Sequence, residues 1–161
     1  MSDATRCIEA LELEPHPEGG FYREIYRSPQ PVTTGERVRP ASTSIYYLLP
    51  KGEFSAWHVV QSDEQWHHYA GEPGATLELH LLHDGAHEML SLGSEIFAGQ
   101  LPQAMVPAGV VQAARPVGGW VLMGCTVAPG FDFADFALNS ADDLYRDFPA
   151  HRKIIDEFLS R

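Results

Sequence analysis

The residues of this chain that are best suited to chemistry lie close together, between Gly52 and Gly71. His58 carries an imidazole that can take up or release a proton near neutral pH, and the carboxylate of Glu64 can hold that imidazole in one tautomer. Trp66 adds an indole face on which a sugar or a nucleobase can stack. Together these residue types predict a site that binds a small molecule and can move a proton to or from it.

Two strands are expected to position these side chains. The segments FSAWHVV and EQWHHYA are rich in β-branched and aromatic residues and meet at the polar segment QSDE, a pattern that predicts a β-hairpin. Because alternate residues of a strand share a face, His58 lies with Val60, and Glu64 lies with Trp66 and His68. We expect the imidazole, the carboxylate and the indole to converge where the two faces coincide.

A tyrosine on the preceding strand is a candidate for the group that returns a proton to the substrate. The strand STSIYYLL contains Tyr46 and Tyr47 side by side, so one of them must face inward and the other outward. The pattern leaves open which one faces inward, and both stay candidate ligand-binding residues.

The rest of the chain predicts an all-β sandwich or barrel, because short strands alternate with turn signals at intervals of about 8–12 residues. A short helix over residues 3–12 precedes the strands, and Pro149 opens a helix that follows them. We expect one domain over residues 1–161, with the barrel over about 19–137 and C-terminal helices over about 140–160. Residues 28–40 predict a loop, and FDFADF predicts a strand with a bulge at Phe136.

The central hairpin resembles the first motif of the cupin superfamily, G-x5-H-x-H-x3-E-x6-G. Two glycines, His58 and Glu64 are in register with it, and Val60 stands at the position of the second histidine. The second motif, G-x5-P-x-G-x2-H-x3-N, is half present. Pro107-Ala108-Gly109 supplies its turn, and Gln112 occupies its histidine position.

Longer segments resemble the cupin-5 family, whose members are small single-domain cupins of largely undefined biochemical role. The resemblance runs to about Asp147 and rests on HPEGGFYRE, STSIYYLL, SDEQWHHYAG, VPAGVVQAARP and GCTVAPGFDFADF. It implies an all-β cupin double-stranded β-helix, a jelly-roll barrel, with short N- and C-terminal helices. It also implies a homodimer.

The resemblance further implies a set of site residues. Cupin sites hold a divalent metal through histidines and a glutamate, which would make His58, Glu64 and the amide oxygen of Gln112 tentative ligands here. His68 could join them if it faces the same cavity. Because Val60 removes one imidazole, any such metal is expected to bind weakly, and the cofactor stays unknown.

Three functions stay open at this point. The first is an isomerase or epimerase that acts on a sugar-like or carbonyl substrate, with His58 and Glu64 catalytic, as in the cupin-type sugar-nucleotide epimerases. The second is a non-catalytic pocket for a small ligand, with Trp66 as its platform, and the third is a metal-dependent oxygenase. In addition, Arg23, Arg115 or Lys51 could meet a substrate phosphate. Against all three stands a purely structural interpretation, in which these side chains only fill the barrel.

Charge and length exclude several partners. The chain has 11 Lys and Arg against 22 Asp and Glu, a net charge of −11, and an acidic surface repels the phosphate backbone of nucleic acids. No apolar run approaches the ~20 residues of a membrane span, and MSDATRC lacks the features of a signal peptide. We therefore expect a cytoplasmic protein that binds neither nucleic acid nor membrane.

The other reactive residues predict no second site. Cys7 and Cys125 are expected to be buried thiols rather than a disulfide. His80, His83 and His87 flank a predicted hairpin turn, and their spacing matches no zinc-binding pattern, so surface histidines are favoured over a metal cluster.

Overall fold

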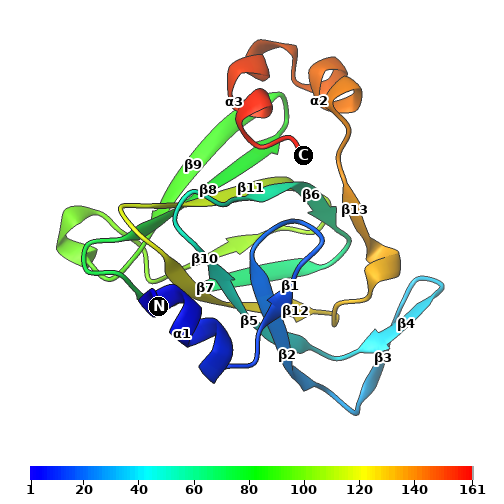
Figure 1. Ribbon diagram of the computed structural model, residues 1–161. Coiled ribbons are helices and arrows are strands. Elements are labelled where there is room, and N and C mark those ends of the chain that lie inside the picture. Colours follow the sequence, from blue (N-terminus) through cyan, green and yellow to red (C-terminus); the bar gives the residue numbers. More distant parts are fainter. Residues whose placement is uncertain (161) are drawn as a thin grey trace.

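The computed structural model describes residues 1–160, whose strands form two larger antiparallel sheets and one separate hairpin (Figure 1). The first sheet has the strand order β1 (Glu14–Pro15), β2 (Phe21–Arg27), β5 (Thr43–Leu49), β12 (Val121–Ala128), β7 (Asp63–Gly71) and β10 (Gln103–Val106). The second has the order β13 (Phe136–Leu138), β6 (Ser55–Val60), β11 (Val111–Val117), β8 (Thr76–His83) and β9 (Ala86–Leu92). The expected all-β fold is confirmed.

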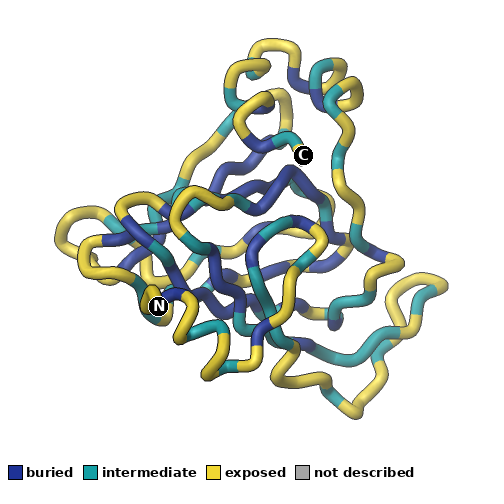
Figure 2. Tube along the Cα trace, viewed as in Figure 1, coloured by how far each residue is buried: buried dark blue, intermediate teal, exposed yellow. Residues whose placement is uncertain are grey.

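The main core lies between these two sheets, and alternation along the strands fills it. On β8, Leu77, Leu79 and Leu81 are 0, 0 and 4% exposed, and they share one hydrophobic cluster with Trp66 and Met123 of the first sheet. Burying a leucine side chain in this way stabilises the fold by about 1.5–3 kcal/mol. Figure 2 shows the buried stretches concentrated in the paired strands, with the exposed stretches at the hairpin turns and chain ends.

Short helices cover the outside of the barrel at both ends of the chain. Helix α1 (Asp3–Ala10) is capped by Ser2, whose hydroxyl accepts a hydrogen bond from the amide of Thr5 at 3.2 Å. The C-terminal elements are α2 (Ala141–Asp147), the 3-10 turn η3 (Pro149–His151) and α3 (Arg152–Glu157). They pack on the second sheet, where the indole of Trp57 donates to the carbonyl of Ile155 at 3.0 Å. No helix among residues 1–160 is long and apolar enough to cross a membrane.

Three segments differ from the expected structure. FSAWHVV and EQWHHYA were predicted to pair as a hairpin, but β6 lies in the second sheet between β13 and β11, and β7 lies in the first sheet between β12 and β10. Residues 28–40 contain a hairpin, β3 (Pro31–Thr34) and β4 (Arg37–Pro40), where a loop was predicted, and it projects away from the C-terminal helices (Figure 1). Likewise FDFADF is not a continuous strand. The side chain of Asp132 accepts a hydrogen bond from the amide of Ala134 at 2.8 Å, which starts the 3-10 turn η2 (Phe133–Asp135) before β13. One further 3-10 turn, η1 (Ile96–Ala98), lies between β9 and β10.

Candidate functional site

A cavity of about 510 Å³ opens at one end of the barrel. Its buried part carries titratable side chains from β6, β7 and the loop that precedes β2, and its exposed part carries aromatic rings from the segment between β12 and β13. The lining residues are Glu14, His16, Glu18, Tyr22, Glu24, Arg27, Thr43, Ile45, His58, Val60, Glu64, Cys125, Val127, Phe131, Asp132, Phe133 and Phe136.

The centre of the buried part is a contact between Glu18 and His58. The Nε2 atom of His58 lies 3.2 Å from Oε2 of Glu18, and the two residues are 1 and 9% exposed. The other carboxyl oxygen of Glu18 accepts a hydrogen bond from the hydroxyl of Ser55 at 2.9 Å. No guanidinium or ammonium group within residues 1–160 forms an ion pair with Glu18.

The geometry of a glycine turn brings Glu18 into the barrel. Gly19 and Gly20 adopt φ angles of 109° and 71°, a region that favours glycine, and a Cβ on Gly19 would collide with the carbonyl oxygen of Phe54. The carbonyl of Glu18 accepts a hydrogen bond from the amide of Ala56 at 2.8 Å, which fastens the turn to β6. Glu18 therefore reaches His58 from a segment that lies far from β6 in the sequence.

The hydrogen bonds of His58 define where its protons lie. Nδ1 is 2.8 Å from the carbonyl oxygen of Ala56, which can only accept, so Nδ1 carries a proton. Burial lowers the pKa of His58 and raises the pKa of Glu18, and both directions favour the neutral forms. In these neutral forms the Glu18 carboxyl donates a hydrogen bond to the free Nε2 of His58.

His16 completes this part of the wall from the same turn. Its Nδ1 accepts a hydrogen bond from the amide of Glu18 at 3.2 Å and lies 3.7 Å from the Glu18 carboxyl. Burial lowers the pKa of His16, so the ring is neutral near pH 7 and carries its proton on Nε2.

Glu64 is a second buried carboxyl on the cavity wall, and it is 7% exposed. Its Oε2 accepts a hydrogen bond from the side-chain amide of Gln112 at 2.7 Å. The orientation of that amide is fixed because its oxygen accepts from the indole N–H of Trp66, which can only donate, at 2.9 Å. Burial raises the pKa of Glu64 to about 7, so this carboxyl exchanges its proton near neutral pH.

Cys125 also lines the cavity, without a nucleophilic role. Burial, and after it the charges of Glu64 and Glu18, raise the pKa of this cysteine well above its ordinary value. The side chain therefore stays a thiol at neutral pH, in agreement with the expected buried, unpaired cysteine.

Aromatic rings form the exposed part of the cavity. Phe131 and Phe133 lie with ring centroids 5.0 Å apart at 84°, and Phe133 and Phe136 lie 6.0 Å apart at 82°. From β2, the ring of Tyr22 packs edge to face against the ring of His16, with the ring centroids 4.5 Å apart. Phe133 is 50% exposed, so its ring stands at the entrance.

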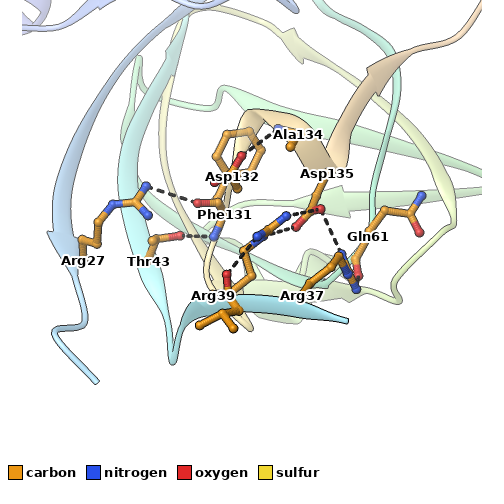
Figure 3. Close-up of polar contacts among 10 residues, drawn as sticks. Arg27, Arg37, Arg39, Thr43, Gln61, Phe131, Asp132, Ala134 and Asp135 are labelled. Carbon is orange, nitrogen blue, oxygen red and sulfur yellow. Dashed lines mark hydrogen bonds and ion pairs between the residues drawn. The ribbon is translucent and has the colours of Figure 1, made fainter. Parts of the chain in front are cut away.

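Arginines hold the aromatic segment in place, as Figure 3 shows. Asp135 is buried, and Arg39 binds its carboxylate through two hydrogen bonds of 2.7 and 2.9 Å, while Arg37 lies 3.0 Å from it. The hydrogen bond from Arg39 is the largest of the effects that lower the pKa of Asp135. From β2, Arg27 donates to the carbonyl of Phe131 at 3.2 Å.

The predicted residues His58 and Glu64 both reach the cavity, but the carboxyl group nearest to His58 is that of Glu18. His58 and Glu64 both line the cavity together with Val60. The carboxyl oxygen at 3.2 Å from the His58 ring, however, belongs to Glu18, whereas Glu64 acts on His58 through its charge and hydrogen-bonds to Gln112.

Three further predicted residues lie behind the cavity wall. Trp66 and Tyr47 are 1 and 0% exposed and belong to the apolar core, and their rings pack edge to face at 5.6 Å. Tyr47 is the inward one of the tyrosine pair, and its hydroxyl donates to the carbonyl of Gly19 at 2.7 Å. Gln112 bridges Trp66 to the site and does not itself line the cavity.

Tyr46 and His68 lie elsewhere. Tyr46 faces outward and packs in the cluster beneath α1. His68 is half-buried and does not line the cavity, and its Nε2 has no hydrogen-bond partner within residues 1–160. The pairing of β7 with β12 shifts register beside His68, which ends the alternation that was predicted to bring this ring to the site.

The donor groups do not fit the metal that the cupin motif implies. Val60 offers no donor atom, and the oxygen of Gln112 already accepts from an indole N–H. Both ring nitrogens of His58 face protein oxygens, one of Ala56 and one of Glu18. Within residues 1–160, no three or more His, Cys, Asp or Glu side chains are grouped so that they could hold a metal ion.

The sequence interpretation missed Glu18 and His16 as site residues. Both lie in HPEGG, which was interpreted only as a break between regular elements. The signal that was available is the combination of an acid with two consecutive glycines, which indicates a close approach of the backbone to another segment.

Comparison with known proteins gives one family and several related structures. A family model described as Cupin_5, Cupin superfamily (DUF985), matches residues 5–139. A hypothetical protein from Leishmania major is 31% identical with a TM-score of 0.91, and the match covers 99% of this chain and 100% of that one. A protein from Shewanella oneidensis is 36% identical with a TM-score of 0.88 and 99% coverage of both chains. An uncharacterized protein from Saccharomyces cerevisiae is 28% identical over 88% of this chain and 78% of the yeast protein.

Proposed function

This chain belongs to the Cupin_5 family of the cupin superfamily, and within it we propose that the protein is a metal-independent isomerase or epimerase for a small carbonyl compound. The proposed reaction is the removal of a proton from the carbon next to a carbonyl group and its return to the substrate. One observation carries this proposal: two buried carboxyl groups in different surroundings line one cavity, and neither is neutralised by an arginine or lysine within residues 1–160.

The two carboxyl groups suit opposite halves of a proton transfer. Glu64, with a pKa of about 7, is partly ionised at neutral pH and can take the proton from carbon. In its neutral form, which burial favours, the Glu18 carboxyl beside His58 can donate a proton to the developing enolate oxygen. In an isomerisation, Glu64 then delivers its proton to the neighbouring carbon, and the second hydroxyl group of the enediol gives its proton back to Glu18, so charge and atoms balance without a redox step. Two titratable groups whose surroundings differ are typical of acid–base sites.

The surroundings of the cavity argue against a nucleotide or phosphate substrate. Arg23 pairs with Glu12 at 2.8 Å, and Arg115 pairs with Glu78 at 2.7 Å, and neither arginine lines the cavity. Lys51 does not line it either. A volume of about 510 Å³ suits a molecule the size of a monosaccharide.

Binding without turnover is the second candidate, and the aromatic entrance favours it. Rings such as that of Phe133 can hold an apolar face of a ligand whether or not a reaction follows. The two candidates differ in one respect: only an isomerase exchanges carbon-bound hydrogen with solvent.

The test is hydrogen exchange in heavy water. The protein is incubated with a chelator and, in turn, with aldoses, ketoses, amino ketones and 2-oxo acids, and incorporation of deuterium next to the carbonyl is followed by NMR. We expect exchange with at least one compound, and a loss of about 10²–10⁴-fold in Glu64→Gln. The matched control, Glu78→Gln, should keep the wild-type rate because Glu78 does not line the cavity. Binding of a compound with no exchange would favour the second candidate.

The family resemblance also supports a homodimer, and exposed apolar side chains offer a surface for it. β9 and β10 are edge strands of the two sheets, and Met89, Met105 and Phe97 near these edges are 48, 48 and 108% exposed. Sedimentation at micromolar concentration should give twice the mass of the chain. A single species of 17.8 kDa would contradict the dimer.

A further inference from the structure

The geometry of the cavity points to a small organic cation as its ligand, a protonated amine that also bears the carbonyl group. This inference rests on the proposed function for the carbonyl and goes beyond it for the charge. It stands on two independent features, the balance of fixed charges around the cavity and the arrangement of its aromatic rings.

Acidic groups outnumber basic ones along the cavity. Five carboxyl groups line it, and Arg27 is the one arginine or lysine among the lining residues that the structure describes. Arg27 is already engaged, because its guanidinium binds the carboxylate of Glu24 through two hydrogen bonds of 2.8 Å. This leaves three carboxyl groups, those of Glu14, Glu18 and Glu64, without a guanidinium or ammonium partner in the described chain, while the fourth, Asp132, interacts with Arg27 and Arg39 only through longer-range charge.

The chain places arginines just outside the cavity, where they serve the fold. Arg37 and Arg39 both contact Asp135, which is buried behind the aromatic segment and does not line the cavity (Figure 3). A ligand in the cavity therefore meets carboxyl groups without their counter-ions. The carboxylates that are ionised would repel an anionic ligand there and attract a cation.

The aromatic entrance has the arrangement that a cation prefers. The rings of Phe131, Phe133 and Phe136 meet in pairs at 84°, 82° and 64°, with centroids 5.0 to 6.1 Å apart, and the half-exposed ring of Phe133 is the one that is most open to a ligand. The face of a phenylalanine ring carries partial negative charge and attracts an ammonium group. Phenylalanine offers no hydrogen-bond donor, so this entrance has little to offer the hydroxyl groups of a neutral sugar.

The buried carboxyl groups favour a protonated amine over a quaternary ammonium ion. A carboxylate accepts hydrogen bonds, and N–H groups supply donors that a quaternary nitrogen lacks. Glu64 offers an acceptor in the interior, and the phenylalanine rings line the route to it. Together with the proposed proton transfer, these features define the substrate class as amine-bearing carbonyl compounds, such as amino sugars and amino ketones.

The experiment compares ligands that match in shape and differ in charge. Calorimetry measures the binding of glucosamine against glucose and gluconate, and of aminoacetone against hydroxyacetone and pyruvate, at low and high salt. We expect at least one amine to bind 10-fold or more tightly than its neutral counterpart, the anions to bind least, and added salt to weaken the amine. If every amine binds no better than its neutral counterpart, the inference is overturned.

Variants at the entrance distinguish a site that is specific for cations from non-specific apolar binding. Phe133→Leu and Asp132→Asn should each weaken amine binding by about 3- to 10-fold and weaken binding of the neutral counterpart less. Phe133 is half exposed, so its replacement is expected to leave the fold intact, and Glu78→Gln is the matched control outside the cavity. Equal losses for amine and neutral ligand would overturn the assignment of these residues to a cation site.

The same samples keep this inference apart from the proposed function. Deuterium exchange in neutral carbonyl compounds without a preference for amines would support the isomerase and overturn the cation. Tight binding of an amine without exchange in any carbonyl compound would support the cation site and overturn the isomerase.

Discussion

Two of the histidine–glutamate pairs in this barrel have an almost completely buried imidazole, and they differ in what surrounds the carboxylate. At the cavity, Nε2 of His58 is 3.2 Å from Glu18, and beneath the C-terminal helices Nε2 of His80 is 3.3 Å from Glu78. Both imidazoles are almost completely buried, at 1 and 3% exposure. By residue type, separation and burial of the imidazole, the two pairs are nearly the same.

The carboxylate of the second pair has a counter-ion. Arg115 donates to Glu78 at 2.7 Å, and although burial opposes it, this arginine holds the pKa of Glu78 below its ordinary value. The His80 ring is enclosed as well, because its Nδ1 lies 3.0 Å from His87 and its face lies against Phe158 at 4.8 Å. Every group of this pair has a partner, and neither residue lines the cavity.

The first pair has an enclosed imidazole as well, but its carboxyl group lacks a counter-ion. Glu18 and the nearby Glu64 have no arginine within the described chain, and burial raises the pKa of each. The difference teaches that a histidine beside a glutamate is not itself a site. The chemistry requires a carboxyl group that has no counter-ion and faces open space.

The largest effect is expected when Glu18 loses its carboxyl group, which tests whether the His58–Glu18 pair takes part in the reaction. In Glu18→Gln the amide can still donate a hydrogen bond to His58, but it cannot release a proton. We expect exchange of carbon-bound hydrogen to fall by about 10²–10⁴-fold. Circular dichroism should be unchanged, and an unchanged rate with an intact fold would show that this pair takes no part in the reaction.

A second test compares the stability of the wild type and Glu64→Gln across pH. The pKa of Glu64 is about 7 in the folded protein against an ordinary value of 4.5, so the unfolded chain releases its proton first as the pH rises. Stability of the wild type should therefore fall between pH 4.5 and 7, relative to the variant, by roughly 3 kcal/mol and then level off. Urea titrations at several pH values measure this difference. If it does not vary with pH, Glu64 does not retain its proton.

The arginine-bound carboxylate of Asp135 should show the opposite behaviour. Asp135→Asn removes the acceptor of two arginines, and we expect it to lower the free energy of unfolding by about 2 kcal/mol. The pKa of Asp135 is lowered from 3.8, so this contribution is present above pH 3.8 and is lost as the pH falls through the lower, folded-state value. A more stable variant at neutral pH would contradict the account.

The smallest effect is expected at Glu78. Its side chain is 23% and that of Arg115 39% exposed, and ion pairs with this much access to water contribute little. We expect Glu78→Gln to change the free energy of unfolding by less than about 1 kcal/mol, and to leave the exchange rate as it is. A large loss of exchange in this variant would remove the distinction between the two pairs.

Local pattern was enough to predict the barrel, the strands that carry His58 and Glu64, and that both side chains reach its interior. Alternation and turn chemistry act over a few residues, and they decide these features. The same reasoning failed where distant segments meet. Glu18 reaches His58 through a glycine turn, and Trp66 is separated from the cavity by Gln112, and neither contact leaves a periodic signal in the sequence.

The aromatic entrance was also beyond local pattern. FDFADF alternates as a strand does, but the hydrogen bond from Ala134 to Asp132 and the arginines on Asp135 turn it into a 3-10 segment. Those arginines come from β4 and its turn, in a region that was predicted to be a loop. Because the contacts join residues almost a hundred positions apart, tertiary structure overrides the local preference.

One measurement addresses the difference between the two pairs without any ligand. Carboxyl carbons of the glutamates are followed by ¹³C NMR across a pH titration, with Glu18→Gln, Glu64→Gln and Glu78→Gln used to assign the signals. The account predicts that Glu64 titrates near pH 7, that Glu18 titrates above 4.5, and that Glu78 titrates below 4.5. If all three titrate together below pH 5, the cavity holds ordinary carboxylates and the proposed acid–base site does not exist.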